Sequence, residues 1–177
     1  DLVLPDDGHM YRSDDTVTLS WDGSDPNPGD DLTFDVYLDR QSDPDTRVSK
    51  EQMSESYQAE GLEAGYEYYW KVVVSDGEFE TESEIQSFTI NRKPTVDLTS
   101  PEDEEILDST STTLYWDATD DGGMSSLTYD IYFGTNSDPD TIIGDGQYER
   151  EVDVSNREND TTYYWFVEVD DGYETTR

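Results

Sequence analysis

The chain has 177 residues, of which 45 are acidic and 10 are lysine or arginine, so its net charge at pH 7 is −35. Because like charge repels a nucleic-acid backbone, this composition excludes nucleic-acid binding. The chain contains no cysteine, which excludes disulfide bonds and thiolate metal sites, and no apolar run approaches the ~20 residues that a membrane-spanning helix needs.

The first half of the chain alternates short apolar runs with turn-forming residues, a pattern typical of β-strands. Residues 2–4, followed by Pro5, predict an edge strand, because proline has no N–H group to donate to a neighbouring strand. The Asp-rich stretch 22–31 predicts a loop. Residues 51–60 fit either a strand or a helical turn. Further strands are predicted at residues 16–21, 32–38, 47–49, 68–74 and 83–90.

One stretch of the chain occurs twice: YYWKVVVSDG at residues 68–77 reappears, 95 positions later, at residues 163–172 as YYWFVEVDDG. Such internal similarity marks a tandem duplication. We therefore predict two domains, 1–92 and 93–177, each long enough to bury a core of its own. The second copy ends before any counterpart of the strand at 83–90.

Short strands at a spacing of 8 to 12 residues, with turns between them, predict a β-sandwich. The residues that resemble the fibronectin type III family are a tryptophan in the second strand, two alternating apolar residues in the third, and a leucine six positions before a tyrosine: Trp21, Phe34, Val36, Leu62 and Tyr68. The resemblance covers nearly the whole chain and is strongest to modules of archaeal and bacterial surface proteins. It implies an all-β fold of two tandem fibronectin type III-like β-sandwich domains, the second lacking its last strand within this chain.

The resemblance also implies a tyrosine corner, in which the hydroxyl of Tyr68 bonds to the backbone upstream. The second copy carries Arg157 where the first carries Leu62. The existence of the same corner at Tyr163 is therefore an open question at the level of sequence.

Low hydrophobicity with high net charge is typical of disordered chains. Here the apolar residues fall in alternating runs rich in Trp, Tyr and Val, which favours a folded protein. At molar ionic strength the Debye length is about 3 Å, so concentrated salt would suppress the repulsion between carboxylates. Aspartate outnumbers glutamate and lysine occurs only at positions 50, 71 and 93, a composition that resembles proteins of salt-loving archaea. A calcium-rich exterior is the alternative source of the same screening.

No pattern in the sequence indicates catalysis. Paired carboxylates carry little information in a chain this acidic, and a glycosidase would need two of them across a pocket. His9 is the single histidine, and we expect it at the surface. Neither a Ser-His-Asp arrangement nor a glycine-rich phosphate loop is present. We therefore predict that the protein is not an enzyme and takes no cofactor other than Ca²⁺.

The aspartate-dense loops are the best candidates for a ligand site, because hard oxygen ligands at short spacing suit Ca²⁺. No EF-hand pattern is complete, and solvated acid adapted to salt is the alternative interpretation. In a tandem of such sandwiches, several of these loops are expected to meet at the linker 91–94, where a cation would stiffen the junction. The candidate ligands are Asp22, Asp25, Asp43, Asp45, Asp117, Asp120, Asp121, Asp170 and Asp171.

Several aromatic side chains alternate with the predicted core and so face the other side of their strands. Exposed aromatics are common at partner-binding and sugar-binding surfaces. Ordinary cross-strand pairs that shield the sheet are the alternative interpretation. The candidates for a partner surface are Tyr37, Tyr69, Tyr132, Tyr164 and Phe166.

The chain begins at Asp1 and shows no signal peptide, so we expect it to be a segment of a longer protein. An N-glycosylation sequon at Asn159, on a predicted exposed corner, agrees with an extracellular, cell-surface location. We predict a non-enzymatic structural or adhesive repeat module of a surface-layer, filament or stalk protein. A carbohydrate-binding or spacer module attached to a secreted enzyme is the alternative. Expected partners are neighbouring domains or subunits of the same assembly, which could donate the missing strand by β-augmentation, and glycans.

Overall fold

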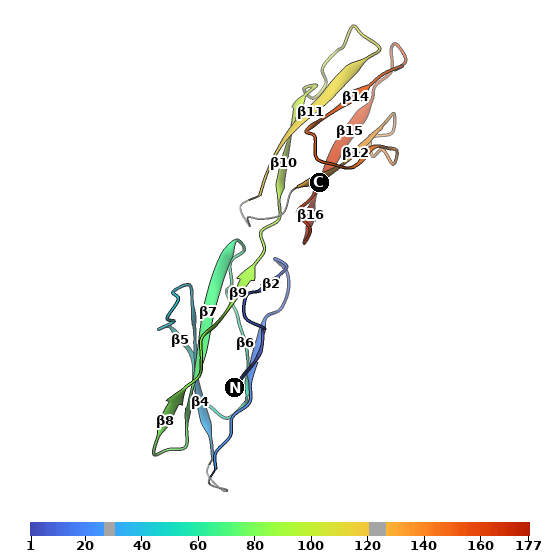
Figure 1. The fold of residues 1–177 in the computed structure, drawn as a ribbon. Helices are drawn as coiled ribbons and strands as arrows, with labels where there is room; N and C mark the ends of the chain where they lie inside the picture. The colour runs from blue at the N-terminus through green and yellow to red at the C-terminus, as the bar shows by residue number, and fades with distance from the viewer. Residues whose placement is uncertain (27–30, 121–126) are drawn as a thin grey trace. The chain divides into compact units, whose positions relative to one another are not determined.

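The computed structural model describes residues 1–26, 31–120 and 127–177. The chain divides into two compact units, Asp1–Asn91 and Arg92–Arg177, called unit 1 and unit 2 below. All of the regular secondary structure in the described residues is β-strand (Figure 1). The predicted all-β fold is therefore confirmed.

Unit 1 is built from two sheets. The first has the order β1-β3-β6 and consists of β1 (Leu2–Leu4), β3 (Thr18–Trp21) and β6 (Ser56–Gln58). The second has the order β2-β9-β7-β4-β5 and consists of β2 (His9–Tyr11), β9 (Gln86–Ile90), β7 (Tyr66–Ser75), β4 (Thr33–Asp39) and β5 (Arg47–Gln52). The short strand β8 (Glu80–Glu82) pairs with the end of β7.

Unit 2 repeats this plan. Its first sheet has the order β10-β11-β14 and consists of β10 (Thr95–Ser100), β11 (Thr112–Thr119) and β14 (Glu151–Val154). Its second sheet has the order β13-β12-β15-β16 and consists of β13 (Ile142–Gln147), β12 (Thr128–Gly134), β15 (Tyr164–Asp170) and β16 (Thr175–Thr176). In both units the chain passes between the sheets in the order of a fibronectin type III-like β-sandwich, as the sequence predicts.

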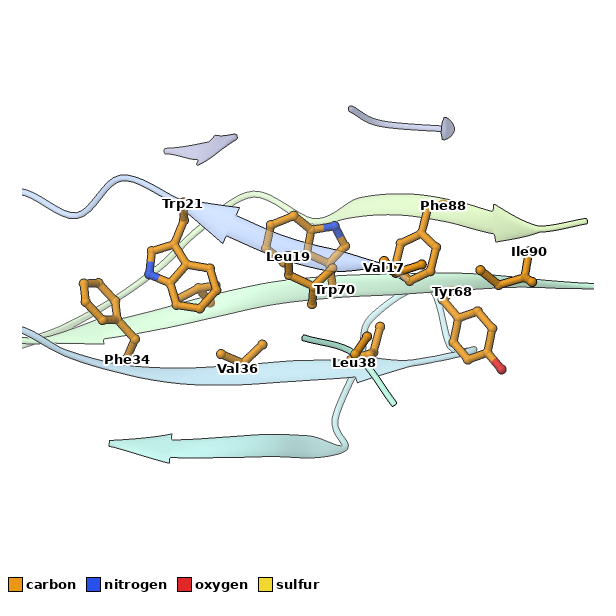
Figure 2. Close-up of a cluster of buried hydrophobic side chains, with 12 residues drawn as sticks. Val17, Leu19, Trp21, Phe34, Val36, Leu38, Tyr68, Trp70, Phe88 and Ile90 are labelled. Atoms are coloured by element: carbon orange, nitrogen blue, oxygen red, sulfur yellow. The ribbon is translucent and has the colours of Figure 1, made fainter. Parts of the chain in front are cut away.

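Alternating side chains of both sheets form the core of unit 1 (Figure 2). Strands β4 and β7 pair in antiparallel register, so that Val36 faces Val72 and Leu38 faces Trp70. Residues on one face of each strand are buried, and Trp70 is 0% exposed. The core of unit 2 contains the corresponding residues, with Trp116, Tyr129 and Val167 among the most deeply buried.

The structure corrects the expected strands in three places. Strand β2 was not expected; it pairs in parallel with β9 and places His9 at the surface. The stretch 51–60 contains strand β6 and no helical turn. A short strand that was not expected, β16, pairs with β15 at Val169 and Asp170. By its position in the repeat, β16 corresponds to β8, so among the described residues unit 2 has no counterpart of β9, as the sequence predicts.

Both units contain a tyrosine corner. The hydroxyl of Tyr68 accepts a hydrogen bond from the backbone N–H of Glu63 at 2.8 Å. The hydroxyl of Tyr163 accepts the equivalent bond from Glu158 at 3.0 Å. Arg157 does not prevent this, because its guanidinium donates to the carbonyl of Ser109 at 2.7 Å instead of entering the core as Leu62 does.

Candidate functional site

A row of side chains crosses the outer face of the larger sheet at the same level in each unit. Cross-strand register fixes the row, because Tyr37 lies opposite both Arg47 and Lys71, and Tyr132 lies opposite both Ile142 and Phe166. We call these sets the outer rows. The outer row of unit 1 is Arg47, Tyr37 and Lys71, to which Glu82 belongs by its ion pair with Lys71. The outer row of unit 2 is Ile142, Tyr132 and Phe166, to which Arg177 belongs by its contact with the Phe166 ring.

The outer row of unit 1 is held by ion pairs. The Lys71 ammonium lies 2.8 Å from a carboxylate oxygen of Asp43 and 3.6 Å from one of Glu82, and 5.8 Å from the ring centre of Tyr37. The hydrogen bond to Asp43 raises the pKa of Lys71, burial lowers it by less, and the charge of Glu82 raises it further. Its side chain is only 13% exposed, so the aliphatic stem covers the sheet while the charge is paired.

The outer row of unit 2 is held by stacking. The rings of Tyr132 and Phe166 lie nearly parallel, with centroids 4.4 Å apart and an interplanar angle of 10°. The Arg177 guanidinium lies 3.5 Å from the centroid of Phe166 and forms an ion pair with Asp138. Burial, and then the negative charges of Glu168 and Asp130, raise the pKa of Tyr132.

Both outer rows contain a cation paired with an aspartate, but the cation comes from a different position in each unit. Asp138 is the counterpart of Asp43, at the same point of the repeated SDPDT sequence. In unit 1 its partner is Lys71 on β7, whereas in unit 2 that position is Phe166 and the partner is Arg177, after β16. The duplication has therefore kept an aspartate, a cation and an aromatic ring together while moving the cation across one strand.

This geometry bears on the predicted partner surface. A sugar ring stacks on an open aromatic face, but the ring of Phe166 is stacked on Tyr132 and has the Arg177 guanidinium over it. Tyr37 has Lys71 beside it, and the hydroxyl of Tyr69 donates to Glu67 at 2.7 Å. Tyr164, 41% exposed, is the most accessible ring of the predicted set. The contacts favour cross-strand shielding for Tyr37, Tyr132 and Phe166. Tyr69 is bonded within its own strand, and Tyr164 is left as the candidate contact residue.

The different position of the cation in the two units leads to a prediction for unit 1. Lys71→Phe should lower the stability of unit 1 by about 1 kcal/mol, because Asp43 and Glu82 lose their partner. Adding Glu82→Arg should restore most of the loss by recreating the arrangement of unit 2. A double-mutant cycle measured by urea unfolding should therefore give a favourable coupling of about 0.5–1 kcal/mol between the two substitutions. Strictly additive effects would contradict it.

The predicted metal ligands are distributed over several loops and strands, and some of them already have protein partners. Asp43 binds Lys71, Asp45 accepts from the side-chain amide of Gln41 at 3.2 Å, and the Asp170 carboxylate accepts from the N–H of Gly172 at 2.6 Å. Asp117 is exposed on β11, Asp22 and Asp25 are exposed or partly so after β3, Asp120 follows β11, and Asp121 lies outside the described residues. Among the residues that the structure describes, no three of His, Cys, Asp or Glu gather in a way that could hold a metal ion.

Asp171 differs from the other aspartates in being 1% exposed. Its carboxylate accepts hydrogen bonds from the N–H groups of Tyr173 and Glu174, both at 2.7 Å, and so shapes the turn between β15 and β16. Glu174, whose side chain is 4% exposed, lies 3.6 Å from the ammonium of Lys93. Asp171 therefore stabilises the turn between β15 and β16 of unit 2.

Asp39 stabilises the turn after β4, a role that the sequence analysis did not predict. It sits at the end of β4, where its carboxylate accepts from the backbone N–H groups of Gln41, Asp45 and Thr46 at 2.7 to 2.9 Å. Burial raises its pKa, but the N–H groups of Thr46, Gln41 and Asp45 lower it by more, so the pKa lies below its ordinary value. In unit 2 the counterpart is Gly134, packed against Pro139.

The role of Asp39 can be tested through its pH dependence. Asp39→Asn leaves one acceptor oxygen for three N–H groups and should cost unit 1 about 1–3 kcal/mol at pH 7. Because the folded pKa is depressed, the wild-type advantage is complete above the unfolded pKa of about 3.9 and is lost as the pH falls through the folded pKa. Thermal unfolding of both proteins between pH 7 and 2 should show converging stabilities, and a pH-independent gap would contradict this.

Asn159 of the sequon is exposed and sits in the corner before β15. The hydroxyl of Thr161 donates to the carbonyl of Asn159 at 3.1 Å, and Asp160 adopts a positive φ of 54°. The corner therefore presents the amide of Asn159 at the surface, and glycosylation there stays a prediction.

Comparison with known proteins gives a limited result. No family model matches the chain, and no curated protein matches it. Among solved structures, the fibronectin(III)-like modules of CbhA from Clostridium thermocellum match with 20% identity and a TM-score of 0.42, over 99% of this chain and 90% of that chain. The FN1-FN3 domains of chicken CNTN1 match with 15% identity and a TM-score of 0.37, over 96% of this chain, which spans 59% of that chain.

These likenesses concern the fold alone, and the assignment of a fibronectin type III-like β-sandwich rests on the strand order of this chain. No helix among the described residues is long and apolar enough to cross a membrane.

Proposed function

We propose that the chain is a non-enzymatic structural or adhesive repeat module of an extracellular surface protein. The observation that carries the proposal is the state of the two outer rows, whose charged and aromatic side chains bind one another within their own unit. Side chains that bind one another across neighbouring strands stiffen the sheet. They are poorly placed to bind a substrate, since a ligand would have to break the existing contacts first.

The structure of each unit supports a load-bearing role. Strand β7 pairs with β4 over seven residue pairs in continuous register from Thr33 to Asp39, and β15 pairs with β12 in the same way from Thr128 to Gly134. A tyrosine corner ties the chain before each of these central strands to its own backbone. The high acidity suits an exterior rich in cations, where salt or Ca²⁺ would screen the charge.

The proposal is tested by pulling single molecules of the 177-residue chain between two handles. Two cooperative unfolding events, one for each unit, are expected. The same protein applied to a panel of immobilised polysaccharides should not be retained. Unfolding without a measurable force peak would argue against a mechanical role.

The retention experiment on polysaccharides also tests the alternative function, carbohydrate binding. Retention on a polysaccharide by the wild-type chain would overturn the proposal if Tyr164→Ala removed it while Tyr69→Ala did not. Tyr69 is the matched control because it occupies the same repeat position in unit 1 and its hydroxyl is bonded to Glu67. Retention that survives both variants but disappears in salt would be ordinary ion exchange.

A further inference from the structure

Strand β9 of unit 1 has no counterpart among the described residues of unit 2, so one edge of β15 is open. In unit 1, β9 pairs with β7 from Tyr66 to Trp70 on one side and with β2 on the other. In the described part of unit 2, β12 pairs with one edge of β15, and β16 pairs with the other edge only at Val169 and Asp170. From Tyr164 to Glu168 this second edge therefore has no strand partner among the described residues.

The aromatic side chain beside this edge is covered in unit 1 and less well covered in unit 2. Tyr68 is 6% exposed, whereas Tyr163, at the same position of the repeat, is only partly buried. In unit 1, the ring of Phe88 on β9 stacks on Tyr68 at a centroid distance of 5.7 Å, and Figure 2 shows the two rings side by side in the core. Phe133 of β12 stacks on Tyr163 in unit 2, but the described residues supply no ring from the side of β9.

The segment 105–107 is the counterpart of β2 and borders the same position in unit 2. The turn before it is closed by a hydrogen bond from the N–H of Glu105 to the carbonyl of Glu102 at 3.1 Å, as the turn before β2 is closed at 3.0 Å. Strand β2 pairs with β9, whereas the segment 105–107 forms no strand pair in the part of the chain that the structure describes. Ile106 is accordingly 90% exposed. We call the position between β15 and the segment 105–107 the strand slot.

Two backbone N–H groups that bond to β9 in unit 1 keep their conformation in unit 2. The N–H groups of Gly8 and Gly65 donate to carbonyls of β9 at 2.9 and 2.8 Å, and these glycines have positive φ values of 74° and 86°. Their counterparts Glu104 and Asp160 have positive φ values of 60° and 54°. Residues with a side chain adopt this conformation at a cost in free energy. Unit 2 therefore retains the backbone arrangement that holds β9, at both ends of the strand slot.

Strand β9 defines the chemistry of an occupant for this slot. Phe88 and Ile90 face the core at 0% and 3% exposure. The N–H and the hydroxyl of Ser87 both donate to a carboxylate oxygen of Asp7, at 2.8 and 3.2 Å, and unit 2 has Asp103 at this position. Strand β9 contains no charged residue, which suits a slot whose borders are acidic.

We propose that the strand slot binds an extended segment of a separate polypeptide, antiparallel to β15 and parallel to the segment 105–107. The segment has a small polar, an aromatic, a polar and an aliphatic residue in succession, as at positions 87–90. Its aromatic ring covers Tyr163, and its carbonyls accept from the N–H groups of Glu104 and Asp160. A second copy of this chain is a poorer source, because its own β9 is already paired on both edges. The inference deepens the proposed adhesive role, since a shared strand joins two molecules.

The test adds an acetylated and amidated peptide of residues 85–91 to the 177-residue chain labelled with ¹⁵N. A saturable shift of the Trp165 indole signal is expected at peptide concentrations up to about 1 mM, with the other three indole signals moving far less. Amide hydrogen exchange reports the two donors directly. At a peptide concentration ten times the dissociation constant, exchange at Glu104 and Asp160 should slow about 10-fold.

A peptide of the same composition controls for general stickiness. It carries Phe88→Thr and Thr89→Phe, which turn the aromatic residue to the outer face of the strand. This peptide should bind at least about 10-fold more weakly than the peptide of residues 85–91.

Paired substitutions in the chain test the position of the slot. Leu107 is the counterpart of Tyr11, whose ring lies edge-on to Phe88 at 5.8 Å. Leu107→Asp should weaken peptide binding at least about 10-fold, because it places a carboxylate beside the bound aromatic ring. Ile142→Asp, on β13 at the opposite edge of the sheet, should leave binding unchanged. The backbone spectrum of each variant reports that the fold is intact.

A chain with the sequence of residues 83–91 added after Arg177 distinguishes the source of the strand. The proposal is overturned if this extended chain shows the Trp165 shift while the free peptide gives none, because the slot then accepts a strand only from its own polypeptide. A dimer of the unextended chain that the peptide disperses overturns the separate partner in favour of a second copy.

The proposal is also overturned if neither the peptide nor the extension changes the Trp165 signal, if both peptides bind equally, or if Leu107→Asp and Ile142→Asp have the same effect. None of these measurements depends on the unfolding force or on polysaccharide retention. Failure of the strand slot and failure of the proposed function are therefore distinguishable.

Discussion

Trp70→Ala is expected to destabilise unit 1 by about 3–5 kcal/mol, because it leaves a cavity of indole size in the middle of the core. The side chain is 0% exposed and lies on β7 between Leu38 of β4 and Gln86 of β9. Its indole nitrogen has no hydrogen-bond partner, so the loss is one of packing and hydrophobic burial. Urea unfolding followed by circular dichroism should show one early transition, with the transition of unit 2 unmoved.

The matched control is Trp165→Ala, at the same position of the repeat. Trp165 is only partly buried against the core of unit 2, so the same truncation should cost about 1–3 kcal/mol. The comparison is informative because residue type and strand are held constant while burial changes. Equal losses in the two variants would show that burial in these cores does not set the cost.

The difference between Trp70 and Trp165 also shows where sequence reasoning stops. The alternation in the repeated stretch predicts correctly that Tyr69, Lys71, Tyr164 and Phe166 face outward. It assigns Trp165 to the core by the same rule, but burial of this position depends on a second neighbour. In unit 1 strand β9 lies beside Trp70, and no described strand pairs with β15 at Trp165 on that side.

The fold was predictable because it depends on patterns within single strands, whereas the sites depend on contacts between distant strands. Strand β2 has three residues and no alternation to reveal it. The partnership of Lys71 with Asp43 spans 28 positions. The repeat aligns Asp43 with Asp138, but it cannot reveal that the cation has moved to Arg177, because Phe166 alone suggests an exposed aromatic surface. The bonding of Asp39 likewise appears only when the turn after β4 closes.

Stability in both units is expected to rise steeply with salt between 0.05 and about 1 M KCl, by about 10 °C or more in melting temperature. A net charge of −35 on a compact chain is self-repulsive, and unfolding relieves the repulsion by spreading the charges. Relief of only 2 kcal/mol corresponds to roughly 8–16 °C for domains of this size. The gain should level off near 1 M, where the Debye length of about 3 Å leaves little repulsion to remove.

The shape of this curve distinguishes screening from other effects of salt. Salt that acts by strengthening hydrophobic burial continues to stabilise well beyond 1 M, so a linear rise to 3 M would contradict a screening mechanism. CaCl₂ at matched ionic strength decides the predicted role of calcium. Equal melting temperatures in KCl and CaCl₂ would mean that the aspartates require only a dense cation atmosphere. An additional increase that saturates at millimolar Ca²⁺ and is reversed by a chelator would mean that some of them form a binding site, because only site binding saturates far below the concentration at which screening does.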